Sequence, residues 1–271
     1  MSDALPLAGC RILVTRPRAQ SRPLVRRLQA LGAEAHVVPA ISIEAPRAGG
    51  PLDQALLGLG DYDWVVVTSA NGARACISRA GSLGVDLSAT PPRWAAIGPA
   101  TARVLRRAGV AVAMTPSRFL TEAIADELHD VRGRRILLPR TEAAPPGLAE
   151  ALRRRGAAVD EVAAYRTVLA PTRSQARLCA LLDGRGVDTV IFTSASTVRG
   201  LLRLLGDRRD ALRQMDIACI GPVTAAAVRQ EGFDPSVVAE EHTVQGLVSA
   251  LVSYHTRHTR GAQHAPDRAA R

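Results

Sequence analysis

The chain has 271 residues, of which 47% are hydrophobic and only 3% are aromatic, so its cores must be built from aliphatic side chains. That length allows two domains of ordinary size, and no apolar run reaches the roughly 18 residues that span a bilayer. All 35 basic residues are arginines and the net charge is +10, which favours an anionic partner. Nucleic acid is a poor candidate, because no basic stretch carries interleaved aromatics and no helix-turn-helix or zinc-finger pattern is present.

Nothing in the sequence indicates export, a metal or a cofactor. The first residues contain no basic stretch followed by an apolar one, so we expect a cytoplasmic protein that does not bind membranes. The four cysteines are scattered and form no C-x-x-C pair, which favours buried, reduced thiols. His255 and His258 have ligand-like spacing but belong to a polar tail, where we expect no partners. Neither a dinucleotide fingerprint nor a P-loop is present.

The predicted elements alternate between short apolar strands and amphipathic helices. In the first half, strands are expected at residues 11–14, 35–38, 64–68, 94–97 and 111–114, and helices at residues 20–31, 52–59, 71–80 and 100–108. Gly32 and Gly109 end two of these helices, and Thr121 caps a further one. The second half repeats this order from Arg135 to a helix that Thr243 opens. Alternating strands and helices indicate parallel sheets with helices on both faces.

Three motifs of the first half return in the second at a nearly constant spacing. The corresponding residues are Gly9 and Gly133, Ser69 and Ser194, and Gly98 and Gly221. The period is far too long for a solenoid, so each copy should be a small domain of a tandem duplication. Two such domains would face a cleft, where ligands usually bind.

Two equivalent stretches, residues 39–46 and 164–171, break the helical pattern. Each alternates in polarity like an exposed strand and ends in Ala-Pro, which stops further strand pairing. We interpret them as crossings between the two domains.

Polar residues follow four of the predicted strands, where each chain segment turns into a helix. The four segments are Thr68-Ser69-Ala70-Asn71, Thr193-Ser194-Ala195-Ser196, Gly98-Pro99-Ala100-Thr101 and Gly221-Pro222-Val223-Thr224. Ligands of open parallel sheets bind at the carboxyl ends of the strands, and helix N-termini favour anions. The sequence therefore predicts a site for carboxylates or phosphates, with ordinary helix capping as the alternative for any single residue.

These motifs give the chain a resemblance to the uroporphyrinogen-III synthase family, from about Gly9 to Tyr254. The motifs that carry it are Val14-Thr15-Arg16-Pro17, Thr68-Ser69-Ala70-Asn71-Gly72, Ile97-Gly98-Pro99-Ala100-Thr101, Ala164-Tyr165-Arg166-Thr167 and Cys219-Ile220-Gly221-Pro222-Val223-Thr224. No single motif is decisive, and the order and spacing of the set are what make the resemblance specific.

The resemblance implies an α/β fold of two flavodoxin-like parallel-sheet domains, derived from a tandem duplication and joined by a two-stranded linker. The first domain is then discontinuous and combines residues 1–40 with residues 170–256, whereas residues 44–166 form the second. Residues 257–271 are expected to be a disordered basic tail. The repeat alone would divide the chain near residue 125, so the discontinuous division rests on the resemblance.

The implied activity is that of a lyase of tetrapyrrole (porphyrin and heme) biosynthesis. It cyclises hydroxymethylbilane, a linear tetrapyrrole, to uroporphyrinogen III, with loss of water and inversion of the terminal pyrrole ring. The substrate carries eight carboxylates, which fits the arginine excess and the helix N-termini. The resemblance implies neither a cofactor nor a metal. We expect a monomer, with the upstream bilane-forming enzyme as a candidate partner.

Tyr165 matches the family's tyrosine, the side chain to which departure of the hydroxyl group as water is most often assigned. A phenol stays protonated at neutral pH and can donate a proton, although packing within the linker is the alternative role. The expected substrate-binding residues, many of them acting through backbone amides, are Arg16, Ser69, Asn71, Gly98, Thr101, Arg140, Ser194, Ser196, Gly221, Val223 and Thr224.

Two non-enzymatic functions remain open from the sequence. One is a regulator that senses a tetrapyrrole or another anion with the same fold, although no segment after Tyr254 is long enough for a winged helix. The other is a two-domain clamshell protein that binds a small anion. Supplying hydroxymethylbilane and identifying the product isomer separates both from the synthase.

Overall fold

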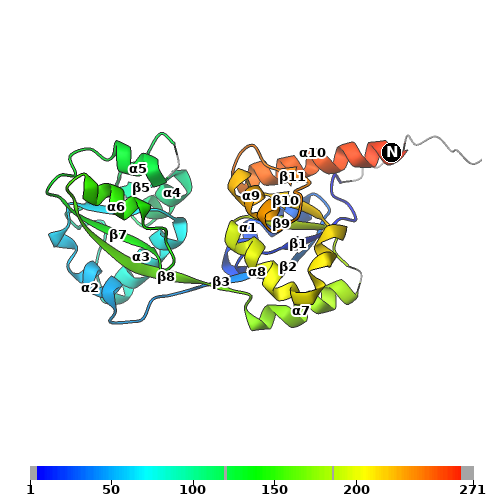
Figure 1. Ribbon diagram of the computed structural model, residues 1–271, viewed down its shortest axis with the longest axis horizontal. Coiled ribbons are helices and arrows are strands. Elements are labelled where there is room, and N and C mark those ends of the chain that lie inside the picture. The colour runs from blue at the N-terminus through cyan, green and yellow to red at the C-terminus, as the bar shows by residue number, and fades with distance from the viewer. Residues whose placement is uncertain (1–4, 119–120, 185, 264–271) are drawn as a thin grey trace, which may run out of the picture. The chain divides into compact units, whose positions relative to one another are not determined.

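The computed structural model describes residues 5–118, 121–184 and 186–263. The chain divides into two compact units, the first made of residues 1–42 and 168–271 and the second of residues 43–167. Each unit has its own sheet of parallel strands with helices on both faces, as the alternating sequence pattern predicts (Figure 1). In the described parts of the chain, no helix is both long and apolar enough to cross a membrane.

Unit 1 contains a five-stranded sheet in the order β11-β10-β9-β1-β2, and all its neighbouring strands are parallel. The elements of this unit are β1 (Arg11–Val14), α1 (Arg18–Ala30), β2 (Glu34–Val37), α7 (Thr172–Asp183), β9 (Thr189–Phe192), α8 (Ala195–Leu205), the 3₁₀ segment η2 (Gly206–Gln214), β10 (Asp216–Cys219), α9 (Pro222–Gln230), β11 (Val237–Val238) and α10 (Val244–Gln263).

The central strands of unit 1 are apolar along their length because helices cover both faces of the sheet. Alternate residues of a strand point to opposite faces. Thus Leu13 packs with residues of α8 and α9, whereas Ile12 and Val14 pack with residues of α1 and α10. A sheet with two covered faces needs no polar alternation, which explains the continuous apolar run of β1.

Unit 2 contains a sheet in the order β3-β8-β7-β4-β5-β6. Its elements are β3 (Ile41–Glu44), which begins at the junction with unit 1, α2 (Pro51–Leu57), the 3₁₀ segment η1 (Leu59–Asp61), β4 (Trp64–Val67), α3 (Ala70–Leu83), β5 (Arg93–Ala96), α4 (Pro99–Arg107), β6 (Val112–Met114), α5 (Thr121–Glu127), β7 (Arg135–Thr141), α6 (Gly147–Arg154) and β8 (Ala158–Leu169). Neighbours from β8 to β6 are parallel. Two separate apolar clusters cover its two faces.

Local signals place several helix ends. Gly32 and Gly109 have φ angles of +91° and +80°, a left-handed conformation that glycine adopts without strain, and each follows a helix as predicted. Thr243 caps α10, since its Oγ1 accepts a hydrogen bond from the Gly246 amide at 2.9 Å. The side chain of Thr121, predicted as a cap, lies outside the described part of the chain.

Helix α10 corrects the prediction of a disordered tail. It continues to Gln263, so residues 257–263 are helical, and residues 264–271 lie outside the description. Between Gly246 and Gly261 the chain contains neither glycine nor proline to end the helix. His255 also has partners, contrary to expectation, because its Nδ1 lies 3.7 Å from Cys10 Sγ and its Nε2 lies 3.4 Å from Thr189 Oγ1.

The two Ala-Pro-ended segments form strands that are neighbours in the sheet of unit 2. The first contains β3, and the second is the end of the long strand β8. Arg166 and Glu44 form an ion pair with a 2.6 Å separation across these strands. The second segment is less exposed than its alternation predicts, because Ala164 and Tyr165 are buried.

Candidate functional site

Each sheet has one point at which the direction of winding reverses. In unit 1, β2 lies on one side of β1, and β9, β10 and β11 follow on the other. In unit 2, β8 lies on one side of β7, and β4, β5 and β6 follow on the other. Loops diverge at such points and leave a crevice at the carboxyl ends of the strands. We therefore expect a site at the carboxyl ends of β1 and β9 in unit 1, and of β7 and β4 in unit 2.

In unit 2 this position holds a pair of hydroxyl groups from β8 and the start of α3. Tyr165 Oη lies 3.0 Å from Ser69 Oγ. Ser69 is also the N-cap of α3, and its Oγ accepts a hydrogen bond from the Gly72 amide at 3.0 Å. The cap fixes the serine hydroxyl, and the serine in turn fixes the phenol. The structure thus brings together two residues that the sequence predicted for one site.

An irregularity in β8 directs Tyr165 towards Ser69. Arg140 and Thr141 are consecutive on β7, but they pair with Ala163 and Tyr165, so Ala164 is an extra residue in the strand. Such a bulge lets two consecutive side chains face the same side of a sheet. Ala164 and Tyr165 indeed belong to the same buried cluster. Without this bulge, the strand's alternation would turn the phenol to the opposite face.

The first turn of α3 lies close against β7. A Cβ on Gly72 would be 3.2 Å from the Pro139 carbonyl oxygen and 3.4 Å from Ser69 Oγ, so glycine permits the close approach. Asn71, which was predicted to bind substrate, is half-buried on this turn and accepts a hydrogen bond from Arg74 at 3.1 Å.

Arg140, which was predicted as a binding residue, is held by contacts within unit 2. The residue is 5% exposed. Its Nη1 donates hydrogen bonds to Glu161 Oε2 at 2.9 Å and to the Pro145 carbonyl at 2.8 Å. The buried charge is therefore paired within unit 2, where it fixes the loop that follows β7.

In unit 1 the corresponding position is occupied by the end of β1 and the start of α8. Thr15 is fully buried, and its Oγ1 donates to the Ile191 carbonyl of β9 at 2.7 Å. Arg16 follows, half-buried, with its Nη2 3.4 Å from Gln20 Oε1. Ser194 caps α8 by accepting from the Thr197 amide at 3.3 Å. In return, Thr197 Oγ1 accepts a hydrogen bond from the Ser194 amide at 3.2 Å, which completes a capping box.

The remaining predicted residues lie at the starts of α4 and α9. Gly98 and Gly221 are the N-caps, and in these described segments neither helix has a side-chain cap. Proline follows each glycine and has no amide hydrogen, so the next donors are the second and third helical residues. The amides of these residues have no acceptor within the helix. Their Thr101 and Thr224 side chains are 3% and 4% exposed, whereas Val223 is 74% exposed.

The N-termini of these four helices thus fall into two kinds. The starts of α3 and α8 are satisfied by the chain's own serines, whereas those of α4 and α9 leave amide donors for another acceptor. The partial positive charge of a helix N-terminus makes an anion the favoured acceptor. Ser196, half-buried on the first turn of α8, completes the predicted set.

Two of the four cysteines, Cys76 and Cys219, are buried thiols. Burial raises the pKa of the Cys76 and Cys219 thiols to about 12, so neither is a reactive thiolate at neutral pH. All four cysteines are free. Within the part of the chain that the structure describes, no three His, Cys, Asp or Glu side chains gather to hold a metal ion.

Two structural features at the carboxyl ends of the strands were not predicted from the sequence. One is the bulge at Ala164, which no residue type in β8 indicates. The other is His242, which lies against Gly221 although 21 residues separate them in the chain: a Cβ on Gly221 would be 2.7 Å from His242 Cδ2. By contrast, the serine followed three residues later by Thr197 is close to the capping-box pattern and could have been recognised.

The fold defines a doubly wound α/β protein, in which two helices at the carboxyl ends of the strands, α4 and α9, begin without a side-chain cap. The family model of uroporphyrinogen-III synthase HemD matches residues 22–249. The chain therefore belongs to the uroporphyrinogen-III synthase family.

Individual relatives are similar to this chain along nearly their whole length. The chain is 32% identical over 253 residues to the uroporphyrinogen-III synthase of Synechococcus elongatus, covering 91% of this chain and 96% of the relative. It is 29% identical over 248 residues to that of Salmonella typhimurium, covering 89% and 99%.

Solved structures share the fold. A mutant uroporphyrinogen III synthase from the thermophilic bacterium Thermus thermophilus matches with a TM-score of 0.66 and 22% identity, covering 92% of this chain and all of that one. The uroporphyrinogen-III synthetase of Helicobacter pylori matches with a TM-score of 0.58 and 16% identity, covering 90% and 99%. At these identities the likeness establishes the α/β fold with parallel sheets.

Proposed function

We propose that this protein is a uroporphyrinogen-III synthase, a lyase that cyclises hydroxymethylbilane to uroporphyrinogen III with loss of water and inversion of the terminal ring. Family membership supports the proposal, and the observation that carries it is the pair of Tyr165 and Ser69 at the winding reversal of unit 2. The relatives above carry the synthase name over nearly their full length, so a regulatory or clamshell function is not favoured.

Tyr165 is the proposed general acid. The bond between the hydroxymethyl carbon and its oxygen breaks, and the oxygen leaves as water after taking the phenol proton. Ser69 Oγ accepts from the Gly72 amide, so its own proton is available for Tyr165 Oη at 3.0 Å. That arrangement leaves the phenol proton to point towards the substrate and stabilises the phenolate that forms.

The N-termini of α4 and α9, which have no side-chain cap, are the proposed carboxylate sites. The second and third residues of α4 and α9 present amide donors at the carboxyl edge of each sheet. A substrate with eight carboxylates has several anionic groups that such amides can bind. Binding the chain at several points also restricts its conformations, which is the orientation that ring inversion requires. Arg16 is the proposed charged contact, whereas Arg140 would act by fixing the loop after β7.

We also propose that the two units are flavodoxin-like domains of a tandem duplication with a two-stranded linker. Counted along the chain, the strands of unit 1 have the order 2-1-3-4-5, which is the flavodoxin order. Unit 2 has the same order when β3 is set aside and the count begins at β7. The proposed domains, residues 1–40 with 170–256 and residues 44–166, follow the two compact units closely. The cytoplasmic location, the monomeric state and the absence of a cofactor stay predictions.

The product isomer tests the proposed function. Hydroxymethylbilane closes by itself to uroporphyrinogen I, so catalysis is recognised by the appearance of isomer III. Purified protein should convert the bilane to isomer III without added metal or cofactor. Formation of isomer I alone, at the spontaneous rate, would exclude the synthase.

A further inference from the structure

The loop between β11 and α10 brings a histidine onto the open start of α9. His242 lies in this loop, and its side chain is exposed. A Cβ on Gly221 would lie 2.7 Å from His242 Cδ2, 3.0 Å from Cγ and 3.2 Å from Nε2. The imidazole therefore lies flat against the backbone of the N-cap. The contact depends on the absence of a side chain at position 221.

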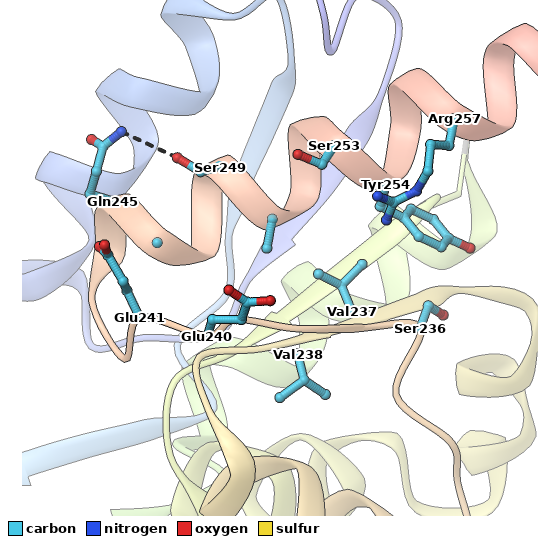
Figure 2. Close-up of a pocket in the computed structure, with 12 residues that line it drawn as sticks. Ser236, Val237, Val238, Glu240, Glu241, Gln245, Ser249, Ser253, Tyr254 and Arg257 are labelled. Atoms are coloured by element: carbon cyan, nitrogen blue, oxygen red, sulfur yellow. Dashed lines mark hydrogen bonds between the residues drawn. The ribbon is translucent and has the colours of Figure 1, made fainter.

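The acidic neighbours of His242 are directed elsewhere. Glu240 and Glu241 line a groove of about 660 Å³ between β11 and α10, together with Gln245 (Figure 2). His242 points instead towards Gly221, beside the helix start whose amides lack a side-chain cap. Both glutamates thus line the groove, whereas the imidazole lies against the start of α9.

We infer that His242 is a substrate-binding residue, which donates a ring N–H to the same carboxylate that the amides of Val223 and Thr224 bind. A neutral imidazole carries one N–H donor, and a protonated one carries two. An exposed ring held beside open amides can add a third donor to an anion site without closing it. This inference rests on the proposed function, because it names a further residue of the same site.

Three substitutions of His242 distinguish the effect of its hydrogen-bond donor from the effects of its aromatic ring and of its side-chain volume. Loss of one hydrogen bond to the carboxylate should raise KM for hydroxymethylbilane about three- to tenfold in His242→Ala, with kcat within about twofold. His242→Phe keeps a ring over Gly221 but has no donor, so it should behave like His242→Ala. His242→Gln keeps a donor and should retain most of the affinity. His258→Ala is the matched control, since His258 is exposed on α10 and bonds to the Tyr254 carbonyl, and its KM should equal that of the wild type.

A second variant tests the position of the ring. Gly221 has φ and ψ of 173° and 178°, an extended backbone that alanine also adopts, so the added Cβ of Gly221→Ala mainly displaces His242. Gly221→Ala should raise KM in the wild-type background and change it little in the His242→Ala background. Full additivity of the two effects, or an unchanged KM in His242→Ala, would overturn the inference. Wild-type protein that forms no isomer III would instead refute the proposed function itself.

Discussion

Tyr165→Phe is the substitution that most sharply separates chemistry from packing. It removes one hydroxyl from a side chain that is 8% exposed and leaves the ring in place. The lost bond to Ser69 is a neutral hydrogen bond, worth about 1 kcal/mol, and Ser69 keeps its bond to the Gly72 amide. We therefore expect the melting temperature to fall by only about 3 °C.

The effect on turnover should be much larger. General-acid catalysis contributes about 10²–10⁴-fold, which corresponds to roughly 2.7–5.4 kcal/mol of transition-state stabilisation. Single-turnover formation of isomer III from hydroxymethylbilane measures the chemical step, and binding of the product should change little. A loss of that size cannot come from a packing defect of about 1 kcal/mol in a protein that stays folded.

Tyr62→Phe is the matched control in the same unit. Tyr62 is 7% exposed, and its hydroxyl donates to Asp160 at 2.9 Å, near the amino-terminal ends of the strands. Because this bond is to a charged carboxylate, Tyr62→Phe should lose at least as much stability as Tyr165→Phe and still keep full turnover. If Tyr165→Phe folds normally and retains turnover within about threefold of the wild type, the phenol is not the acid.

Three further predictions concern the elements that support the site. Ser69→Ala removes both a helix cap and the partner of Tyr165, so it should lower the free energy of unfolding by about 1–2 kcal/mol in chemical denaturation and reduce turnover less than Tyr165→Phe does. Gly200→Ala places a Cβ against the Ala40 carbonyl oxygen and should destabilise the protein by about 3 kcal/mol, whereas Gly147→Ala, with open space around it, should stay within about 1 kcal/mol of the wild type. Burial lowers the pKa of His255 below its usual 6.5, so the folded state favours the neutral ring, and the stabilisation that this provides above pH 6.5 is lost as the pH falls through the folded-state pKa. The stability of the wild type relative to His255→Gln should therefore decrease as the pH is lowered from 7.5 to 5, and a pH-independent difference would contradict this assignment.

Strand and helix patterns predicted much of the fold because burial dictates them directly. The apolar run of β1 and the glycines that end α1 and α4 report local requirements that a sequence displays. The end of α10 was misjudged for the opposite reason. Arg257 and His258 are as polar as a disordered tail, and the helix is visible only when Tyr254 and His255 are seen to contact the rest of unit 1.

The site could be predicted only as a set of positions. Ser69 and Tyr165 were both identified, but their hydrogen bond depends on an extra residue in β8, and register is a property of paired strands. Arg140 looked like a second Arg16 in the repeat, yet its environment differs because Glu161 lies beside it. His242 could not be connected to Gly221 from sequence, since parallel neighbouring strands bring distant loops together at one edge.

The measurement that tests the central claim most directly is the isomer composition formed from hydroxymethylbilane by wild-type protein and by Tyr165→Phe, with Tyr62→Phe alongside. Our account predicts isomer III from the wild type and from Tyr62→Phe, and mostly the spontaneous isomer I from Tyr165→Phe. Equal yields of isomer III from all three proteins would contradict the role of Tyr165, and isomer I alone from the wild type would contradict the function.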